Sequence, residues 1–238
     1  MPLVPPCNYS FPVASTNDFF QLADLISSVG ISATIGLSQR LALSDPLVAR
    51  LISSILTVES RHDAFFRDVQ NRQPNPAPFD TGISAIWAYN IALSFIVPGS
   101  CPVEIPIPKL PILTVADAPV APYANNTNGT VVKAPAAPYA NNTNTNGTSG
   151  ITLKELTWDP TQVPFVVEGD KQLLAGWVNQ VNKPMYTPIT IITSGKGTAR
   201  MPQEMNGIAF VAVTTKQFEN VDDLALGTLA GPAVVVVS

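Results

Sequence analysis

A glutamate and the single histidine of this chain stand three residues apart in a stretch with helical periodicity. Apolar residues precede them at steps of three and four, which is the repeat of one helix face. This predicted inward face consists of Val48, Leu51, Ile52, Ile55, Glu59, His62 and Phe66. A Glu-x-x-His pair on the inner face of a helical bundle is an arrangement that holds iron or manganese. Alternatively, Glu59 pairs with Arg61 or Arg67, and His62 is a core histidine without a metal.

Two cysteines and five N-glycosylation acceptors favour an oxidising, extracellular compartment. Cys7 and Cys101 lie near the two ends of the helical region, which suits one disulfide, although two free buried thiols are the alternative. The acceptors fit the N-x-Ser/Thr rule and are Asn8, Asn125, Asn128, Asn141 and Asn146. The first ten residues lack the basic start and apolar core of a signal peptide. We therefore expect a removed leader or an incomplete amino terminus.

Composition excludes several classes of partner. Only 13% of the 238 residues are charged and the net charge is −4, so we expect neither nucleic acid nor an anionic membrane surface as a partner. No uninterrupted apolar run reaches the roughly 18 residues of a membrane span. With 46% hydrophobic residues, the chain can bury a sizeable core.

The first hundred residues predict three helices. Ser15, Thr16 or Asn17 should cap a helix over about 18–41, in which Gly30, Ala33 and Gly36 would let another helix approach closely. Ser44, Asp45 and Pro46 form a short turn that starts the second helix, so these two helices form an antiparallel hairpin. A third helix is predicted from about 82 to 97. The Pro-rich segment that follows should run extended.

The rest of the chain predicts a low-complexity loop and then strands. Residues 121–148 repeat APYANNTNGT as APYANNTNTNGT, a polar and glycosylatable pattern that cannot fold alone. From 151 onward, β-branched runs alternate with Pro, Gly and Asn, as in an antiparallel sandwich or small barrel. The predicted strands are ITLKELTW, FVVEG, ITIITSG, GIAFVAVTT and PAVVVVS. The fold class is therefore α+β, with a helical region over 1–101, a loop over 102–150 and a β-rich part over 151–238.

Several segments together resemble the fungal secreted ferritin-like proteins, a family linked to stress or desiccation responses. They are CNYSFPV, SSVGISATIG, ILTVESRHDAFFR, SCP and TLAGPAVVVVS. The resemblance implies a ferritin-like helical bundle followed by a β-rich portion, with metal ligands supplied by two helical hairpins. This chain departs from that pattern, because Ser27 stands where the second hairpin should bring a carboxylate. The first hairpin is also missing, so that only Glu59 and His62 remain of the expected ligands.

The incomplete bundle leaves two interpretations. Two chains could pair hairpin to hairpin as a homodimer, which would bring two Glu59 and two His62 together and create a site for iron, manganese or zinc. Alternatively, the third helix and the β-rich half cover the stripe, and Glu59 is held by Arg61 or by a hydroxyl such as that of Ser27.

Together these features favour a non-catalytic, secreted glycoprotein of the extracellular space or cell wall, with a degenerate metal site and no cofactor. A metal-dependent oxidoreductase or storage protein, completed across a homodimer, is the second interpretation. A third is a carbohydrate-binding module in the β-rich half, which would bind cell-wall carbohydrate by stacking on Trp158 and Trp177.

Overall fold

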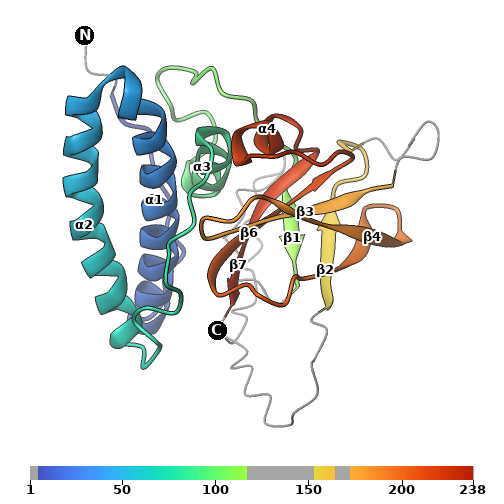
Figure 1. Ribbon diagram of the computed structural model, residues 1–238, viewed down its shortest axis with the longest axis horizontal. Helices are drawn as coiled ribbons and strands as arrows, with labels where there is room; N and C mark the ends of the chain where they lie inside the picture. Colours follow the sequence, from blue (N-terminus) through green and yellow to red (C-terminus); the bar gives the residue numbers. More distant parts are fainter. Residues whose placement is uncertain (1–4, 117–152, 164–171, 238) are drawn as a thin grey trace.

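The computed structural model describes residues 5–116, 153–163 and 172–237. A long helical hairpin lies at one side of the molecule and a β-sheet at the other, with a short helix between them (Figure 1). The sequence prediction of an α+β fold, with a helical hairpin and a third helix followed by a β-rich part, is confirmed. The domain boundaries at 101/102 and 150/151 stay a prediction.

The hairpin consists of α1 (Thr16–Ser44) and α2 (Pro46–Asp68). Ser15 caps α1, since its side chain accepts a hydrogen bond from the backbone N–H of Asp18. Asp45 in turn accepts one from the N–H of Val48, with Pro46 in the first turn of α2. Both caps agree with the sequence prediction, and α1 extends about three residues beyond its predicted end.

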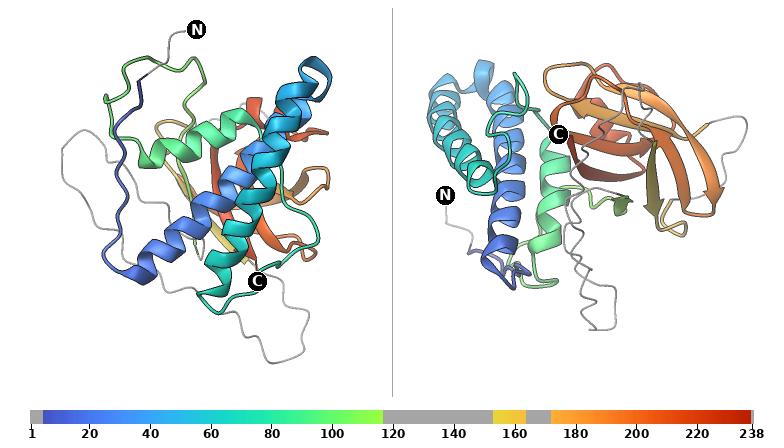
Figure 2. Two further views of the ribbon diagram at one scale, coloured as in Figure 1. Left: turned by 90° about the vertical axis from the view of Figure 1, so that its left-hand side faces the viewer. Right: turned by 90° about the horizontal axis from the view of Figure 1, so that it is seen from below.

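The third helix is shorter than predicted. α3 covers Ala85–Ala92 because Ser84 caps it, and a 3-10 turn (η1, Leu93–Phe95) ends it before Pro98. The views in Figure 2 place α3 between the hairpin and the sheet. The third helix thus connects the two parts of the fold.

In the part of the chain that the structure describes, seven antiparallel strands form one barrel-like sheet in the order β1-β2-β5-β4-β3-β6-β7. Their bounds are β1 Leu113–Val115, β2 Leu153–Trp158, β3 Leu174–Asn179, β4 Met185–Thr193, β5 Lys196–Arg200, β6 Gly207–Thr214 and β7 Ala230–Val237. The two edge strands approach each other, since the N–H of Gly231 at β7 donates to the carbonyl of Pro111, 2.8 Å away and two residues before β1. The sheet therefore closes on itself.

Four of the five predicted strands match β2, β4, β6 and β7, and the fifth, FVVEG, lies outside the described residues. The prediction missed β1, which lies in the segment expected to run extended, and also β3 and β5. The glycines of β3 and β5 weaken the strand pattern but pack closely: a Cβ on Gly176 would meet Leu224 and Tyr186. It also placed Asp222 and Asp223 in a loop, whereas they lie in the first turn of the short helix α4 (Val221–Leu226), which Asn220 caps.

The hairpin and the sheet share a hydrophobic core. Leu25 of α1, Ile83 and two side chains of α3, Trp87 and Ile91, pack toward the outer face of β6 and β7. Phe210 and Val234 are buried there. Trp87 of α3 is fully buried and donates its indole N–H to the hydroxyl of Thr228 at 3.0 Å. One face of α1 is therefore held against the body of the protein.

α1 is also long and apolar enough to cross a bilayer by length and composition, with a mean hydropathy of 1.4 over its best window. Polar residues interrupt its apolar runs, so the sequence analysis did not single it out. Asp24, Ser28 and Ser32 are buried in it, and it packs against α2 and α3. Those are features of a core helix.

The two glycines of α1 give a matched test of this packing. A Cβ on Gly36 would lie 2.0 Å from the carbonyl oxygen of Ile83, whereas one on Gly30 would meet nothing within 4 Å. We expect Gly36→Ala to lower the free energy of unfolding by about 1–3 kcal/mol through overpacking. Gly30→Ala should leave it unchanged or raise it by up to about 1 kcal/mol. Urea titration measures both, and equal effects would contradict the predicted close approach.

Candidate functional site

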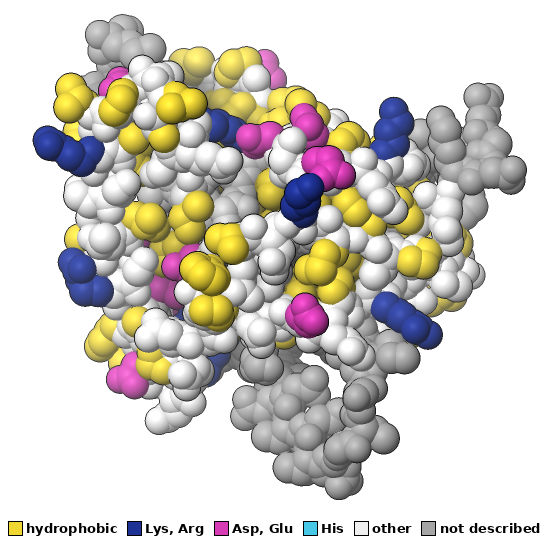
Figure 3. All heavy atoms as spheres, in the orientation of Figure 1, with side chains coloured by type: hydrophobic (Ala, Val, Ile, Leu, Met, Phe, Trp, Pro, Cys, Tyr) yellow, Lys and Arg dark blue, Asp and Glu magenta, His cyan; other side chains and the backbone are white. Residues whose placement is uncertain are grey.

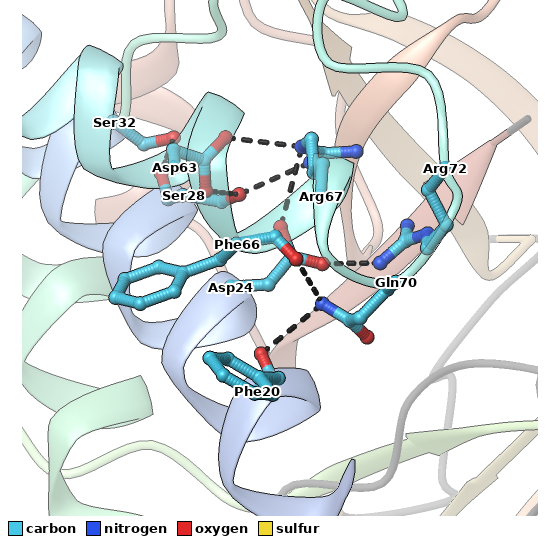
Figure 4. A network of polar contacts seen from close by, with 9 residues as sticks. All are labelled: Phe20, Asp24, Ser28, Ser32, Asp63, Phe66, Arg67, Gln70 and Arg72. Carbon is cyan, nitrogen blue, oxygen red and sulfur yellow. Dashed lines mark hydrogen bonds and ion pairs between the residues drawn. The ribbon is translucent and has the colours of Figure 1, made fainter.

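The interior of the hairpin holds a network of charged side chains where the sequence predicts an apolar seam. Asp24 and Ser28 of α1 face Asp63 and Arg67 of α2, and all four are buried. Figure 4 shows the side chains converging from the two helices, with Arg67 between the carboxylates. The guanidinium of Arg67 is only 3% exposed.

Arg67 contacts both helices. Its Nε donates to Oδ2 of Asp63 at 3.0 Å, and its Nη2 donates to the hydroxyl of Ser28 at 3.2 Å. Ser28 donates in turn to Oδ1 of Asp63 at 2.8 Å. Oδ1 of Asp24 lies 3.2 Å from Nε of Arg67, at ion-pair distance but without hydrogen-bond geometry, because that N–H points at Asp63. Arg72 pairs with Oδ2 of Asp24.

The network balances two carboxylates with two guanidinium groups. Burial raises the pKa of Asp24, and the positive charges of Arg67 and Arg72 oppose that rise. The guanidinium of Arg67 thus acts as a fixed cation inside the helix pair, between one carboxylate from each helix. A metal ion would have to displace it to reach either acid.

A cavity of about 350 Å³ adjoins this network. It lies between the hairpin, the loop 74–80 and the start of β6, and Asp63, Arg67 and Asp80 line it with several serines. Burial raises the pKa of the Asp80 carboxyl, and the negative charge of Asp63 adds to that effect while Arg67 opposes it. The cavity can offer hydroxyl, carboxyl and guanidinium groups to a small polar molecule.

Glu59 and His62 lie elsewhere, on the solvent-exposed surface of α2. Their side chains are 40% and 56% exposed, and Nδ1 of His62 is 3.5 Å from Oε2 of Glu59. The prediction that both point inward is wrong for the single chain. α2 turns the stripe containing Asp63 and Arg67 toward α1, and His62 lies one residue, or about 100°, away from Asp63 on the helix.

Two of the residues proposed to hold Glu59 do not do so. Arg67, named as an ion-pair partner beside Arg61, pairs with Asp63 and Asp24. The hydroxyl that enters the hairpin belongs to Ser28 instead of Ser27. Within residues 5–116, 153–163 and 172–237, no three His, Cys, Asp or Glu side chains converge as a metal site would require. One exposed carboxylate and one imidazole do not fit a carboxylate-bridged di-metal centre.

The predicted disulfide between Cys7 and Cys101 is present. It fixes an extended amino-terminal segment beside the end of η1, where the N–H of Val97 donates to the carbonyl of Asn8 at 2.9 Å. The side chain of Asn8 lies in an exposed part of this segment. The other four glycosylation acceptors, Asn125, Asn128, Asn141 and Asn146, lie outside the described residues.

The sequence alone did not single out Asp24 or Asp63, and it gave Arg67 only as a possible partner of Glu59, because the inward face of the second helix was assigned to the apolar row with Glu59 and His62. One signal was available. Asp63 and Arg67 are four residues apart, as are Asp24 and Ser28, so each pair occupies one helix face. A charged pair on one helix, opposite an acid and a hydroxyl on the other, indicates a buried polar network as readily as a solvated face.

Comparison with known proteins agrees with the helical part of this fold. Residues 1–72 match the family model described as a ferritin-like domain. Over 96% of its length, the chain is 25% identical to Protein rds1 of Schizosaccharomyces pombe. It spans 63% of the length of that relative.

Proposed function

We propose that this ferritin-like chain is a secreted, disulfide-bonded glycoprotein of the extracellular space or cell wall, and that it performs no catalysis. It acts through surface sugars and through assembly. The disulfide supports an oxidising compartment, since such bonds are rare in the cytosol. The exposed acceptor Asn8, in its Asn-Tyr-Ser motif, supports glycosylation.

The observation that carries the non-catalytic assignment is the position of Arg67. It lies at the centre of the hairpin, 3% exposed, and neutralises the two carboxylates that point inward. The Glu-x-x-His pair that would supply metal ligands lies on the outer surface with half of its imidazole in solvent. The interior of the hairpin therefore already contains a cation, the guanidinium of Arg67. Its outer surface offers only the Glu59 and His62 side chains of each chain as metal ligands.

A metal-binding oxidoreductase or storage protein is the second candidate. It is favoured by the proximity of Glu59 to His62 on a surface rich in exposed apolar residues, because a second chain on that surface would add another carboxylate and imidazole. Iron, manganese or zinc would be the metal. This candidate requires the homodimer and fails without it.

The carbohydrate-binding module of the β-rich half loses its support. Trp158 and Trp177 are 4% and 0% exposed and belong to the core enclosed by the sheet. Neither indole can offer a face to a sugar without unfolding the sheet. Cell-wall carbohydrate stays a proposed partner only through the surface of the glycoprotein as a whole.

Metal analysis of the purified full chain tests the proposal. We expect substoichiometric iron, manganese and zinc in the native protein, unchanged in Glu59→Ala and in the control Glu104→Ala, whose side chain is exposed. One metal ion per dimer, lost in Glu59→Ala and retained in Glu104→Ala, would reject the non-catalytic assignment and establish the second candidate. A mass decrease on enzymatic deglycosylation of secreted protein checks the sugars.

A further inference from the structure

The hairpin presents an apolar face to solvent along the length of both helices. On α2, side chains at steps of three and four are all exposed, and Leu51, Ile55 and Phe65 are each more than half exposed. On α1, a second exposed row runs alongside. We call this surface the hairpin face; it consists of Phe19, Ile26, Gly30, Leu37, Val48, Leu51, Ile55, Val58, His62 and Phe65.

Both rows lie on the same side of the hairpin. On α1, Phe20 contacts Phe66 of α2, and Phe19 of the exposed row precedes Phe20 by one residue. On α2, His62 likewise precedes Asp63, which contacts α1. Because the helices are antiparallel, the same offset of one residue turns both rows to one side. Figure 2 shows α1 between α2 and α3, so the hairpin face lies along one side of this row of helices. No His side chain is visible on the face drawn in Figure 3, as expected if the row with His62 lies on another side.

We propose that the hairpin face binds a second copy of this chain about a two-fold axis, forming a four-helix bundle from two hairpins. The inference takes up the assembly role in the proposed function and names the partner. A two-helix layer with one apolar face is half of a four-helix bundle, and an identical layer supplies the other half. The heptad-like 3–4 spacing on α2 is the spacing of such helix contacts.

The area and charge of the face suit a stable dimer of identical chains. Its exposed large side chains would bury on the order of 700 Å² per chain, close to the roughly 800 Å² per partner of specific interfaces. Glu59, Arg61 and His62 are ionisable side chains beside Val58, and Glu59 is near enough to His62 to pair with it. No single sign of charge dominates there to select a charged partner, whereas an apolar copy would be complementary.

The spacing on α2 also defines the register. The row is nearly symmetric about Val58 and Glu59, so two antiparallel α2 helices crossing there would place Ile55 opposite His62. Val48 would lie opposite Val69, the exposed residue that follows α2. The two-fold axis passes beside Val58.

Sedimentation of the full chain at micromolar concentration tests the assembly. We expect the native protein to be a dimer and Ile55→Glu to weaken association on the order of a hundredfold, because it buries a charge in the interface. Ile55 is 54% exposed in the single chain, so the variant should fold. The control Thr57→Glu, exposed on another side of α2, should stay dimeric.

A monomeric native protein overturns the proposal, as does a dimer that Ile55→Glu leaves intact. A monomer with the hairpin face protected from solvent exchange would mean that another segment covers it, which also overturns the proposal. For the register, Val58→Cys should give a disulfide-linked dimer under mild oxidation and Thr57→Cys should not. A dimer that Val58→Cys fails to cross-link overturns the antiparallel register. None of these experiments measures bound metal. The non-catalytic assignment is therefore tested separately, by the metal analysis.

Discussion

Replacing Arg67 with methionine is expected to lower the free energy of unfolding at neutral pH by about 3–5 kcal/mol, the cost of leaving buried carboxylates without their counter-ion. Arg67 joins Asp63, Asp24 and Ser28 across the two helices. Methionine keeps most of the volume, so the loss measures charge and hydrogen bonding more than a cavity. Urea titration followed by circular dichroism measures it.

The effect of this substitution should depend on pH. The pKa of Asp24 is already raised by burial, so Asp24 stabilises the fold fully below its unfolded value of 3.8, and this contribution is lost as the pH rises through the folded value. Removing Arg67 takes away a positive charge that opposes the rise in the pKa of Asp24. The difference in stability between native protein and variant should therefore be smaller at pH 5 than at pH 7.

Two further variants separate the network from general effects on α2. Arg61→Met, on the exposed surface of the same helix, should change stability by less than about 0.5 kcal/mol. Asp24→Asn in the Arg67→Met background should restore part of the loss, because it removes one of the uncompensated charges. A loss below about 1 kcal/mol for Arg67→Met, or no rescue by Asp24→Asn, would show that the network does not hold the hairpin together.

Removing the disulfide is the second large effect that we expect. Cys7 and Cys101 are 94 residues apart, so the bond restricts a long loop of the unfolded chain. Cys7→Ala/Cys101→Ala should lower the free energy of unfolding by about 2–4 kcal/mol. The amino-terminal segment keeps other contacts, including Ser10 N–H to the Phe95 carbonyl at 2.8 Å. The rest of the fold should therefore persist in the variant.

Mass measurement with and without reduction and alkylation checks that the bond is present in the purified protein. Two free thiols in unreduced protein would contradict it. Either single variant provides the control, since both should lose the same stability as the double variant if the loss comes from the bond. An unchanged urea midpoint in the double variant would mean that the backbone contacts alone fix the segment.

Much of the fold follows from local sequence. Ser15 and Asp45 cap their helices as predicted, because a side-chain oxygen just before a helix satisfies a free backbone N–H whatever the rest of the chain does. The β-branched runs that became β2, β4, β6 and β7 were also predictable. β3 and β5 were not, since LAGWVN and KGTAR contain glycine and few β-branched residues. Each pairs with β4, its neighbour in the chain, and also with a strand distant in the chain.

The sequence by itself determined which residues share a helix face, because 3.6 residues per turn fixes their angular positions. It also determined the caps, whereas the two cysteines could be a disulfide or two free thiols until the structure placed them together. Only the tertiary structure decided which face of α2 turns toward α1, and the choice differs from the prediction by one residue. The apolar row with His62 remains exposed, while Asp63 and Arg67 enter the interior, since Asp24 and Ser28 of α1 supply the partners that make burying their charge tolerable. The periodicity of α2 alone does not show which face turns inward. The inward face depends on contacts between residues 35 to 43 positions apart, which meet only in the folded hairpin.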